Sequence, residues 1–396
     1  MKKHLLLSGI TIALLSSTTS LFAKGEIGIF TDAKIKGEIR PRYENVNVNN
    51  GKSDASAFTN RLQLGVNAKL FKVNGLSTYI EMTDVTNRGN FNNTSNNKTN
   101  YQIVADPAQT RVTQAYIDYQ TGKTLIRAGR QGVNLDNQRF IGTVNWRQMP
   151  QTYDAVAIID NSIDNLHLLA AYVDQVNQIK KNSFDTGTVL LHADYSSTPE
   201  VKFTGYGYLI EDVHDTIGVA LTGKIPMNAN SKIHYRAEYA KQNDPSLTDN
   251  IPNQKADADY YNLEVSANSN GLLVGARYEV LSAGKGGNAS FTTPLATLHG
   301  QNGWSDQFLT TPTNGLIDSN IMLGYKAKGF GLAKIIYHDF QAEKGGVNYG
   351  NETDVLYKTK LSAVKGLSGM LKAGFYSADT HNTDSNKYWA MIDYKF

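Results

Sequence analysis

Hydrophobic and polar residues alternate one by one along most of the chain after residue 34. Residues 61–70 carry an apolar side chain at every even position and a polar, charged or glycine residue at every odd one. The same alternation returns at 232–239 and 272–280. Because successive side chains of a strand point to opposite faces, this period predicts strands with one apolar and one polar face. No long stretch has the 3.6-residue period of a helix, so the pattern predicts an all-β protein.

Eighteen segments carry this pattern, and most have the roughly 9–11 residues that a tilted strand needs to cross a bilayer. They are predicted at 34–48, 58–71, 76–88, 111–120, 124–130, 153–160, 166–176, 186–196, 201–211, 216–226, 231–242, 257–267, 271–282, 318–326, 331–341, 354–363, 369–379 and 386–396. Short turns alternate with long polar connections between them, except that the connection at 212–215 is short where a long one is expected. This rhythm is typical of outer-membrane barrels. We therefore predict a transmembrane antiparallel β-barrel of 18 strands, with long extracellular loops and short periplasmic turns.

Both ends of the chain have features of an exported barrel. Lys2 and Lys3 precede an apolar run at 5–15, and a small, polar stretch follows it and ends at Ala23. This order is that of a signal peptide, so we expect residues 1–23 to be removed and residues 24–396 to form the barrel. The last predicted strand alternates and stops at Phe396, which resembles the signal read by the outer-membrane assembly machinery.

Composition excludes several other classes of protein. The 396 residues include 39 basic and 36 acidic side chains, 22 tyrosines and no cysteine. Such a balance lacks the basic excess of a nucleic-acid-binding protein, and the missing cysteines exclude disulfides and thiolate metal sites. The apolar runs are too short for a bundle of membrane-spanning helices. The predicted partners are the lipid bilayer and small hydrophilic solutes.

The polar faces of the strands are expected to line a lumen, because lipid requires the apolar faces on the outside. A barrel of eighteen strands is too wide to be filled by its own strand side chains, so an aqueous channel is expected. Basic residues outnumber acidic ones on these faces. The basic positions are Lys36, Arg40, Arg42, Arg61, Lys69, Arg127, Arg236, Arg277, Lys326, Lys334, Lys358, Lys360, Lys372 and Lys395; the acidic ones are Glu38, Glu44, Glu81, Asp118, Glu238, Glu264, Glu279 and Asp393. A basic lining would attract anions, although pairing across neighbouring strands is an open alternative.

Residues 129–155 read GRQGVNLDNQRFIGTVNWRQMPQTYDA. The order of GRQ, DNQRF, WRQ and TYDA at this spacing resembles the alginate export family of outer-membrane porins. The stretches NRLQLGV at 60–66 and DPAQTRVTQAYIDY at 106–119 precede it in the same order. The resemblance implies an eighteen-stranded barrel with a basic pore for acidic polysaccharide or other small solutes.

This block falls in a long connection and combines arginines with amides and a tryptophan. Guanidinium groups bind carboxylates in a bidentate manner, so the composition fits a pathway for acidic sugars or small organic anions. The arginines and Asp136 could equally tie an inward-folded loop to the wall. We expect 131–152 to fold into the lumen, because it has no apolar face to lay on lipid. The predicted pathway residues are Arg40, Arg42, Arg61, Arg127, Arg130, Asp136, Arg139, Trp146, Arg147, Arg236 and Arg277.

The sequence does not predict an enzyme. The eight histidines include no pair at metal-ligand spacing on one element, and GxSxG, phosphate-loop and HExxH motifs are absent. We therefore predict neither a metal nor a cofactor, and a passive channel for hydrophilic, mainly anionic solutes. Two alternatives remain open: a barrel acting as a surface adhesin or scaffold through the 283–317 loop, and an outer-membrane hydrolase.

Overall fold

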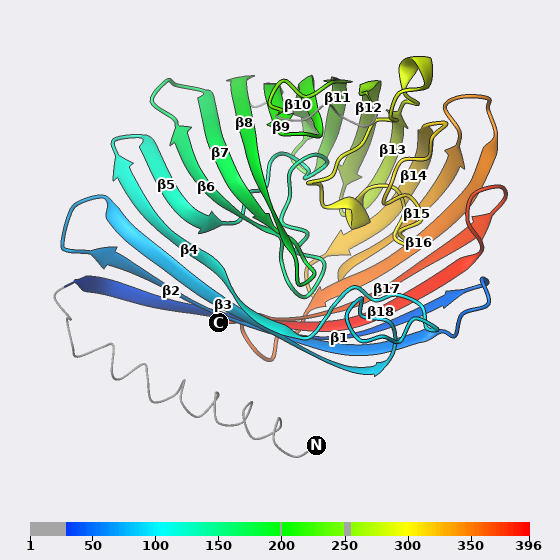
Figure 1. Ribbon diagram of the computed structural model, residues 1–396, viewed down its shortest axis with the longest axis horizontal. Coiled ribbons are helices and arrows are strands. Elements are labelled where there is room, and N and C mark those ends of the chain that lie inside the picture. Colours follow the sequence, from blue (N-terminus) through cyan, green and yellow to red (C-terminus); the bar gives the residue numbers. More distant parts are fainter. Residues whose placement is uncertain (1–28, 199, 249–254) are drawn as a thin grey trace.

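The protein is a closed antiparallel barrel of eighteen strands, described by a computed structural model over residues 29–198, 200–248 and 255–396 (Figure 1). The strands are β1 (Phe30–Val48), β2 (Ala55–Leu70), β3 (Leu76–Asn90), β4 (Gln109–Thr121), β5 (Thr124–Gln131), β6 (Thr152–Asp160), β7 (Leu166–Asn177), β8 (Ser183–Thr198), β9 (Val201–Ile210), β10 (His214–Asn228), β11 (Ser231–Asn243), β12 (Asp257–Ser269), β13 (Leu272–Leu281), β14 (Leu316–Ala327), β15 (Gly331–Gln341), β16 (Asn348–Lys360), β17 (Leu367–Ala378) and β18 (Ser385–Lys395). The predicted fold class and all eighteen strands are confirmed. The predicted signal peptide lies outside the described residues.

Each strand pairs with its neighbours in sequence, and β1 also pairs with β18 to close the sheet. The long connections lie at one end of the barrel, the long-loop end, and the short ones lie at the other, the short-turn end. The connection between β9 and β10 (211–213) is the exception, because it is short but lies at the long-loop end. The described chain begins and ends at the short-turn end, because Phe30 pairs with Leu70 at the β2 turn and Glu38 pairs with Lys395. Within the described ranges, no helix is long and apolar enough to cross a membrane.

The outer wall of the barrel is a belt of exposed apolar side chains. Ile117, Val156, Leu191, Leu263 and Ile321 are 50%, 51%, 48%, 59% and 64% exposed, respectively. Their strand neighbours point inward, and most of them are polar or small, as with Asp118, Ala155 and Asn262. In water such a continuous apolar surface would be unstable, whereas in a bilayer it is required of the lipid-facing side. The alternation of apolar and polar residues in the sequence therefore arises because one face of each strand contacts lipid and the other faces the lumen.

The C-terminal Phe396 lies at the seam where β18 meets β1. Its backbone N–H donates to the Gly37 carbonyl at 3.0 Å, and Gly37 donates back to the Phe396 carbonyl at 2.9 Å. The phenyl ring covers Gly37, where any Cβ would collide with it, and stands 5.5 Å from the ring of Tyr394. Gly37 is thus the position that lets the terminal ring lie flat on the seam.

Deleting Phe396 is expected to lower the yield of folded barrel, because two seam hydrogen bonds worth about 1 kcal/mol each are lost, together with the aromatic ring that we expect the assembly machinery to recognise. Heat-modifiable mobility and abundance in the outer membrane measure the effect. Gly37→Val displaces the ring but keeps Phe396, so it separates seam packing from recognition by the assembly machinery. Unchanged mobility and abundance after the deletion would exclude both roles.

Three long connections fold into the barrel from the long-loop end (Figure 1). We call them loop A (91–108), loop B (132–151) and loop C (282–315); loop C contains two short 3₁₀ turns, Lys285–Gly287 and Leu298–Gly300. Loop B lies inside the lumen, as predicted. Loop C differs from the expectation of an external loop: Phe291, Leu295, Trp304 and Ser305 are at most 7% exposed. The apolar side chains of loop C are buried inside the barrel, whereas an external loop would expose them to water.

Candidate solute pathway

Arg147 of loop B joins all three inward loops to the wall. One of its terminal nitrogens lies 3.2 Å from Glu44 of β1 and 3.6 Å from Asp106 of loop A, and the other lies 3.4 Å from Asp306 of loop C. Lys387 of β18 reaches the same Asp306 carboxylate at 3.1 Å. Burial works against ionisation of Asp306, but its interactions with His299, Lys387 and Arg147 hold the pKa of the carboxyl well below its usual range. The network is therefore a charged clasp at the level where the loops meet.

The wall arginines of β1 and β2 also bind loop segments instead of facing open water. Their hydrogen bonds run from Arg40 to Gln148 at 3.0 Å, from Arg61 to Asn145 at 2.7 Å, from Arg42 to the Trp146 carbonyl at 2.6 Å, and from Arg42 to the Asp106 carboxylate. All three guanidinium groups are at most 5% exposed. Arg61 is paired with Glu38 as well. The alternative in which arginines tie an inward loop to the wall is thus realised here.

Arg139 anchors the other end of loop B. It is 1% exposed, and its Nε lies 3.0 Å from the Glu279 carboxylate of β13. Its terminal nitrogens donate to Thr293 and Asn302 of loop C, both at 3.3 Å. Because the three guanidinium nitrogens contact β13 and loop C, Arg139 holds loops B and C together against the wall.

All three tryptophans of the chain surround one ammonium group, that of Lys372 on β17. The Lys372 Nζ lies 4.2 Å from the ring centre of Trp146 (loop B), 3.9 Å from that of Trp304 (loop C) and 5.4 Å from that of Trp389 (β18). Trp146 is stacked on His299 of loop C with ring centres 4.2 Å apart. Cation–π contact with several indoles stabilises a partly desolvated ammonium. This indole cage is the second device that binds loops B and C to the wall.

His299 completes the cage in its neutral form. Its Nε2 accepts a hydrogen bond from Lys372 at 2.7 Å, and its Nδ1 donates to Asp306 at 2.7 Å. Burial, opposed by Asp306 but reinforced by the Lys372 ammonium, lowers the pKa of the imidazole to about 3. The ring therefore links the indole cage to the charged clasp.

Arg127 and Arg130 occupy opposite faces of β5. Arg127 points inward and forms a bidentate pair with Asp118 at 2.7 and 2.8 Å. Arg130 shares its face with the exposed Ile126, and it pairs with Asp154 at 2.7 Å on the outward side of β6. The side chain of Arg130 thus lies away from the lumen, and we do not retain it among the proposed pathway residues.

Asp136 of loop B meets His192 and Asp194 of β8, with potential ligand atoms within 4.8 Å of one another. The His192 ring lies 2.9 Å from the Asp136 carboxylate. However, the Lys202 ammonium lies 2.9 Å from Asp194 and 3.5 Å from Asp136, so the protein supplies its own cation there. This set fits a charge-neutralised tie of loop B to β8 better than a metal centre, and we assign it no metal.

Arg236 and Arg277 face the lumen but are paired within their own strands. Arg236 bonds Glu238 at 2.8 Å, and Arg277 contacts Glu279. Arg277 also lines a cavity of about 260 Å³ between strands β12 to β15 and the undersides of loops B and C. This cavity, the lumen pocket, is the one polar hollow that we consider as a solute site.

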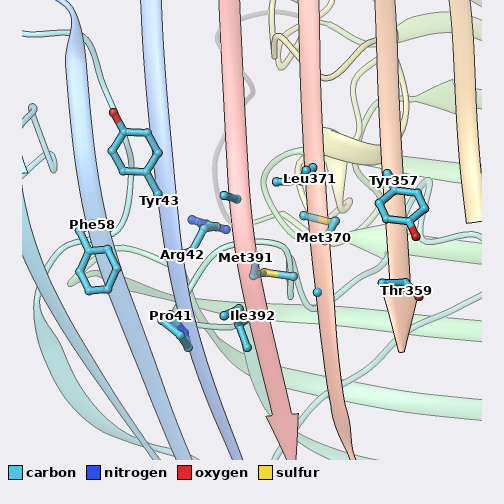
Figure 2. Close-up of a pocket in the computed structure, with 12 residues that line it drawn as sticks. Pro41, Arg42, Tyr43, Phe58, Tyr357, Thr359, Met370, Leu371, Met391 and Ile392 are labelled. Atoms are coloured by element: carbon cyan, nitrogen blue, oxygen red, sulfur yellow. The ribbon is translucent and has the colours of Figure 1, made fainter. Parts of the chain in front are cut away.

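A larger hollow of about 390 Å³ lies on the outer wall across β1, β2 and β16 to β18, between Phe58 and Tyr357 (Figure 2). Small outward residues, Gly369 and Ala390, form its floor. Its apolar lining and its place on the belt turn it toward lipid, so it does not belong to the pathway.

The sequence predicted the connection at 283–317 as a long external loop, and it did not predict that loop C enters the lumen or that His299 and Asp306 form contacts there. The signal was weak, since polar loops with scattered aromatics are usually solvated. Phe291, Leu295, Trp304 and Phe308 in loop C, which are all buried, were the available hint that this connection needs burial.

Known proteins resemble the chain in two ways. The model of the alginate export family matches residues 33–184. Acinetobacter baumannii OccAB4 has the same fold with a TM-score of 0.72 and 15% identity, covering 93% of this chain and 99% of that one. Pseudomonas aeruginosa OccK8 (OprE) and OccK1 (OpdK) each have a TM-score of 0.71, at 11% and 13% identity, respectively. Each alignment covers 93% of this chain and 99% of the Pseudomonas chain. At such identities the likeness shows the fold alone. No curated protein sequence is significantly similar to the chain.

The matched segment comprises β1 to β7 with loops A and B, and it ends at the start of β8. It contains the whole block at 129–155 and both supporting stretches. The resemblance to the alginate export family is therefore confirmed over residues 33–184.

Proposed function

We propose that this protein is a porin of the bacterial outer membrane, through whose lumen small hydrophilic solutes diffuse passively with a preference for anions. The observation that carries the proposal is the closed barrel with an apolar outer belt and a charged inner face. The family match and the Occ structures support it. The short-turn end then faces the periplasm, following the general rule for such barrels.

The preference for anions comes from lysines and not from the arginines. Lys36, Lys326 and Lys358 have no carboxylate within 4.0 Å among the described residues. Each lies on the inward face of its strand by alternation. The lumen arginines, in contrast, are balanced by acidic partners. Unpaired ammonium groups at a wet wall attract anions through a field that salt screens over about 8 Å.

The alternatives receive less support. An adhesin acting through the 283–317 loop needs that loop outside, yet loop C folds into the lumen and buries Phe291, Leu295 and Ser305 there. A hydrolase on the outer wall needs a serine held by a histidine, and no such hydrogen bond exists in the part of the chain that the structure describes. We propose no reaction, cofactor or metal.

A liposome swelling assay tests the channel. Purified folded barrel should admit glycerol and small sugars at rates that fall with solute size. Vesicles that swell no faster than protein-free ones would overturn the proposal.

Lys326→Met with Lys358→Met is expected to move the zero-current potential toward cations at low salt, because two unpaired positive charges leave the lumen. The shift should shrink as ionic strength rises. Lys123→Met is the matched control, since Lys123 lies in a short turn and is paired with Asp164 at 3.1 Å. Equal potentials for the double variant and the control at low salt would contradict a lysine-based preference.

A further inference from the structure

The lumen pocket contains one positive and one negative side chain that the protein leaves unpaired. Lys334 of β15 and Glu264 of β12 both line it. Glu264 is exposed to the lumen and Lys334 is partly buried, and within the described residues neither forms an ion pair within 4.0 Å or a hydrogen bond, whereas the neighbouring Arg236 and Arg277 do. The two side chains therefore line the same cavity but are too far apart to form an ion pair with each other.

Inward orientation of both residues follows from their strands. Leu263 and Val265 on either side of Glu264 are 59% and 51% exposed on the lipid face, and Ile335 next to Lys334 is 44% exposed. Alternation turns Glu264 and Lys334 to the lumen.

The remaining charges around the pocket are already balanced. Glu264 lies opposite Arg236 on one side and Arg277 on the other in the strand register. Those guanidinium groups are engaged by Glu238 and Glu279, and Arg277 is also 3.2 Å from the Asn262 side chain. Each guanidinium therefore already has a carboxylate partner, and neither lies within 4.0 Å of Glu264.

The other walls of the pocket supply a ring face and hydrogen-bonding groups. The Lys334 Nζ lies 5.3 Å from the ring centre of Trp304, which holds the ammonium on one side and leaves the others toward the cavity. Ser266, Asn320 and Gln301 add hydroxyl and amide groups. A volume of about 260 Å³ lies below the roughly 300–1,000 Å³ of pockets for drug-sized ligands, so the occupant is small.

We infer that the lumen pocket is a binding site for small zwitterions of amino-acid size, whose carboxylate pairs with Lys334 and whose ammonium pairs with Glu264. The inference rests on the proposed porin function and names a solute class for it. A simple anion would leave Glu264 unpaired and repelled, and a simple cation would do the same to Lys334. Only a solute with both charges satisfies both side chains, and transient binding in mid-channel aids passage when release stays easy.

Swelling of vesicles in L-alanine, compared with glycerol as a neutral solute of similar size, tests this site. For the wild type, the alanine rate should saturate with concentration and the glycerol rate should not. Lys334→Met and Glu264→Gln should each raise the half-saturating alanine concentration about tenfold, the effect of losing one charged contact, and leave glycerol unchanged. The double variant should be little worse than either single one, since one remaining charge no longer selects a zwitterion.

Lys123→Met is the matched control, because it removes a lysine of a short turn that is paired with Asp164 and lies outside the pocket. Binding of a simple anion is measured separately, as block of single-channel current by sodium propionate in a planar bilayer. Block by propionate that depends on Lys334 but is unaffected by Glu264→Gln, with alanine behaving likewise, would reduce the pocket to an anion site and overturn the inference. Linear alanine rates in the wild type would also overturn it. Failure of glycerol to enter would contradict the porin function itself. This outcome is therefore distinguishable from failure of the zwitterion site, in which glycerol still enters.

Discussion

Arg147→Met is expected to release loops A, B and C from one another and to open the lumen. The substitution leaves Glu44, Asp106 and Asp306 close together without the guanidinium that they share. Breaking a buried ion pair by removing one partner costs about 3–5 kcal/mol. Single-channel recordings should show larger and noisier conductance, and the thermal transition of the barrel should fall.

Arg127→Met provides the comparison. Arg127 also forms a bidentate carboxylate pair, but this pair is 22% and 14% exposed and connects no loop. Partly exposed pairs of this kind contribute about 0.2–1 kcal/mol. Wild-type conductance and stability in Arg147→Met would show that the loops are held by other contacts and that the charged clasp is not what narrows the lumen.

Acidification is expected to loosen the indole cage through His299. In the packed state the imidazole has a pKa of about 3, whereas a released histidine titrates near its ordinary value of 6.5. Between these values the released state binds a proton that the packed state does not, so packing weakens as the pH falls from 6.5 toward 3. The change is at most about 1.4 kcal/mol, or tenfold, for each pH unit. Asp306 adds to it only at lower pH, because its carboxyl stays ionised well below the usual range.

Intrinsic fluorescence reports this change directly, because the three tryptophans of the protein all belong to the cage. Emission of the wild type should change progressively between pH 6.5 and 3.5. His299→Gln keeps a neutral polar group that cannot titrate, so its emission should be flat over the same range. Identical titrations of the two proteins would remove His299 as the sensitive group.

The barrel itself could be predicted from the sequence because its cause is local. Lipid on one side and water on the other impose a period of two on every strand, and short turns impose the connectivity. The short predicted strands at 124–130 and 153–160 also correspond to strands, β5 and β6. The boundaries moved by a few residues, most at the start of β16, where the chain extends beyond the bilayer-facing part of the sheet.

The arrangement inside the lumen could not be predicted in the same way. Alternation places Arg40, Arg42 and Arg61 on the inner face but gives no information on their loop partners, which lie 64 to 108 residues away in sequence. The excess of basic residues on the wall therefore overstated the free positive charge. Asp106 and Asp306, which neutralise much of it, belong to segments with no periodic pattern.

The central claim is that the lumen is an open path for hydrophilic solutes with a preference for anions. Its most direct test is a planar-bilayer recording of the purified full-length barrel under a gradient of potassium chloride. We predict discrete conductance steps and a zero-current potential displaced toward the chloride equilibrium potential, more strongly at low than at high salt. A membrane that stays silent after insertion of folded protein, or a potential displaced toward that of potassium, would contradict the account.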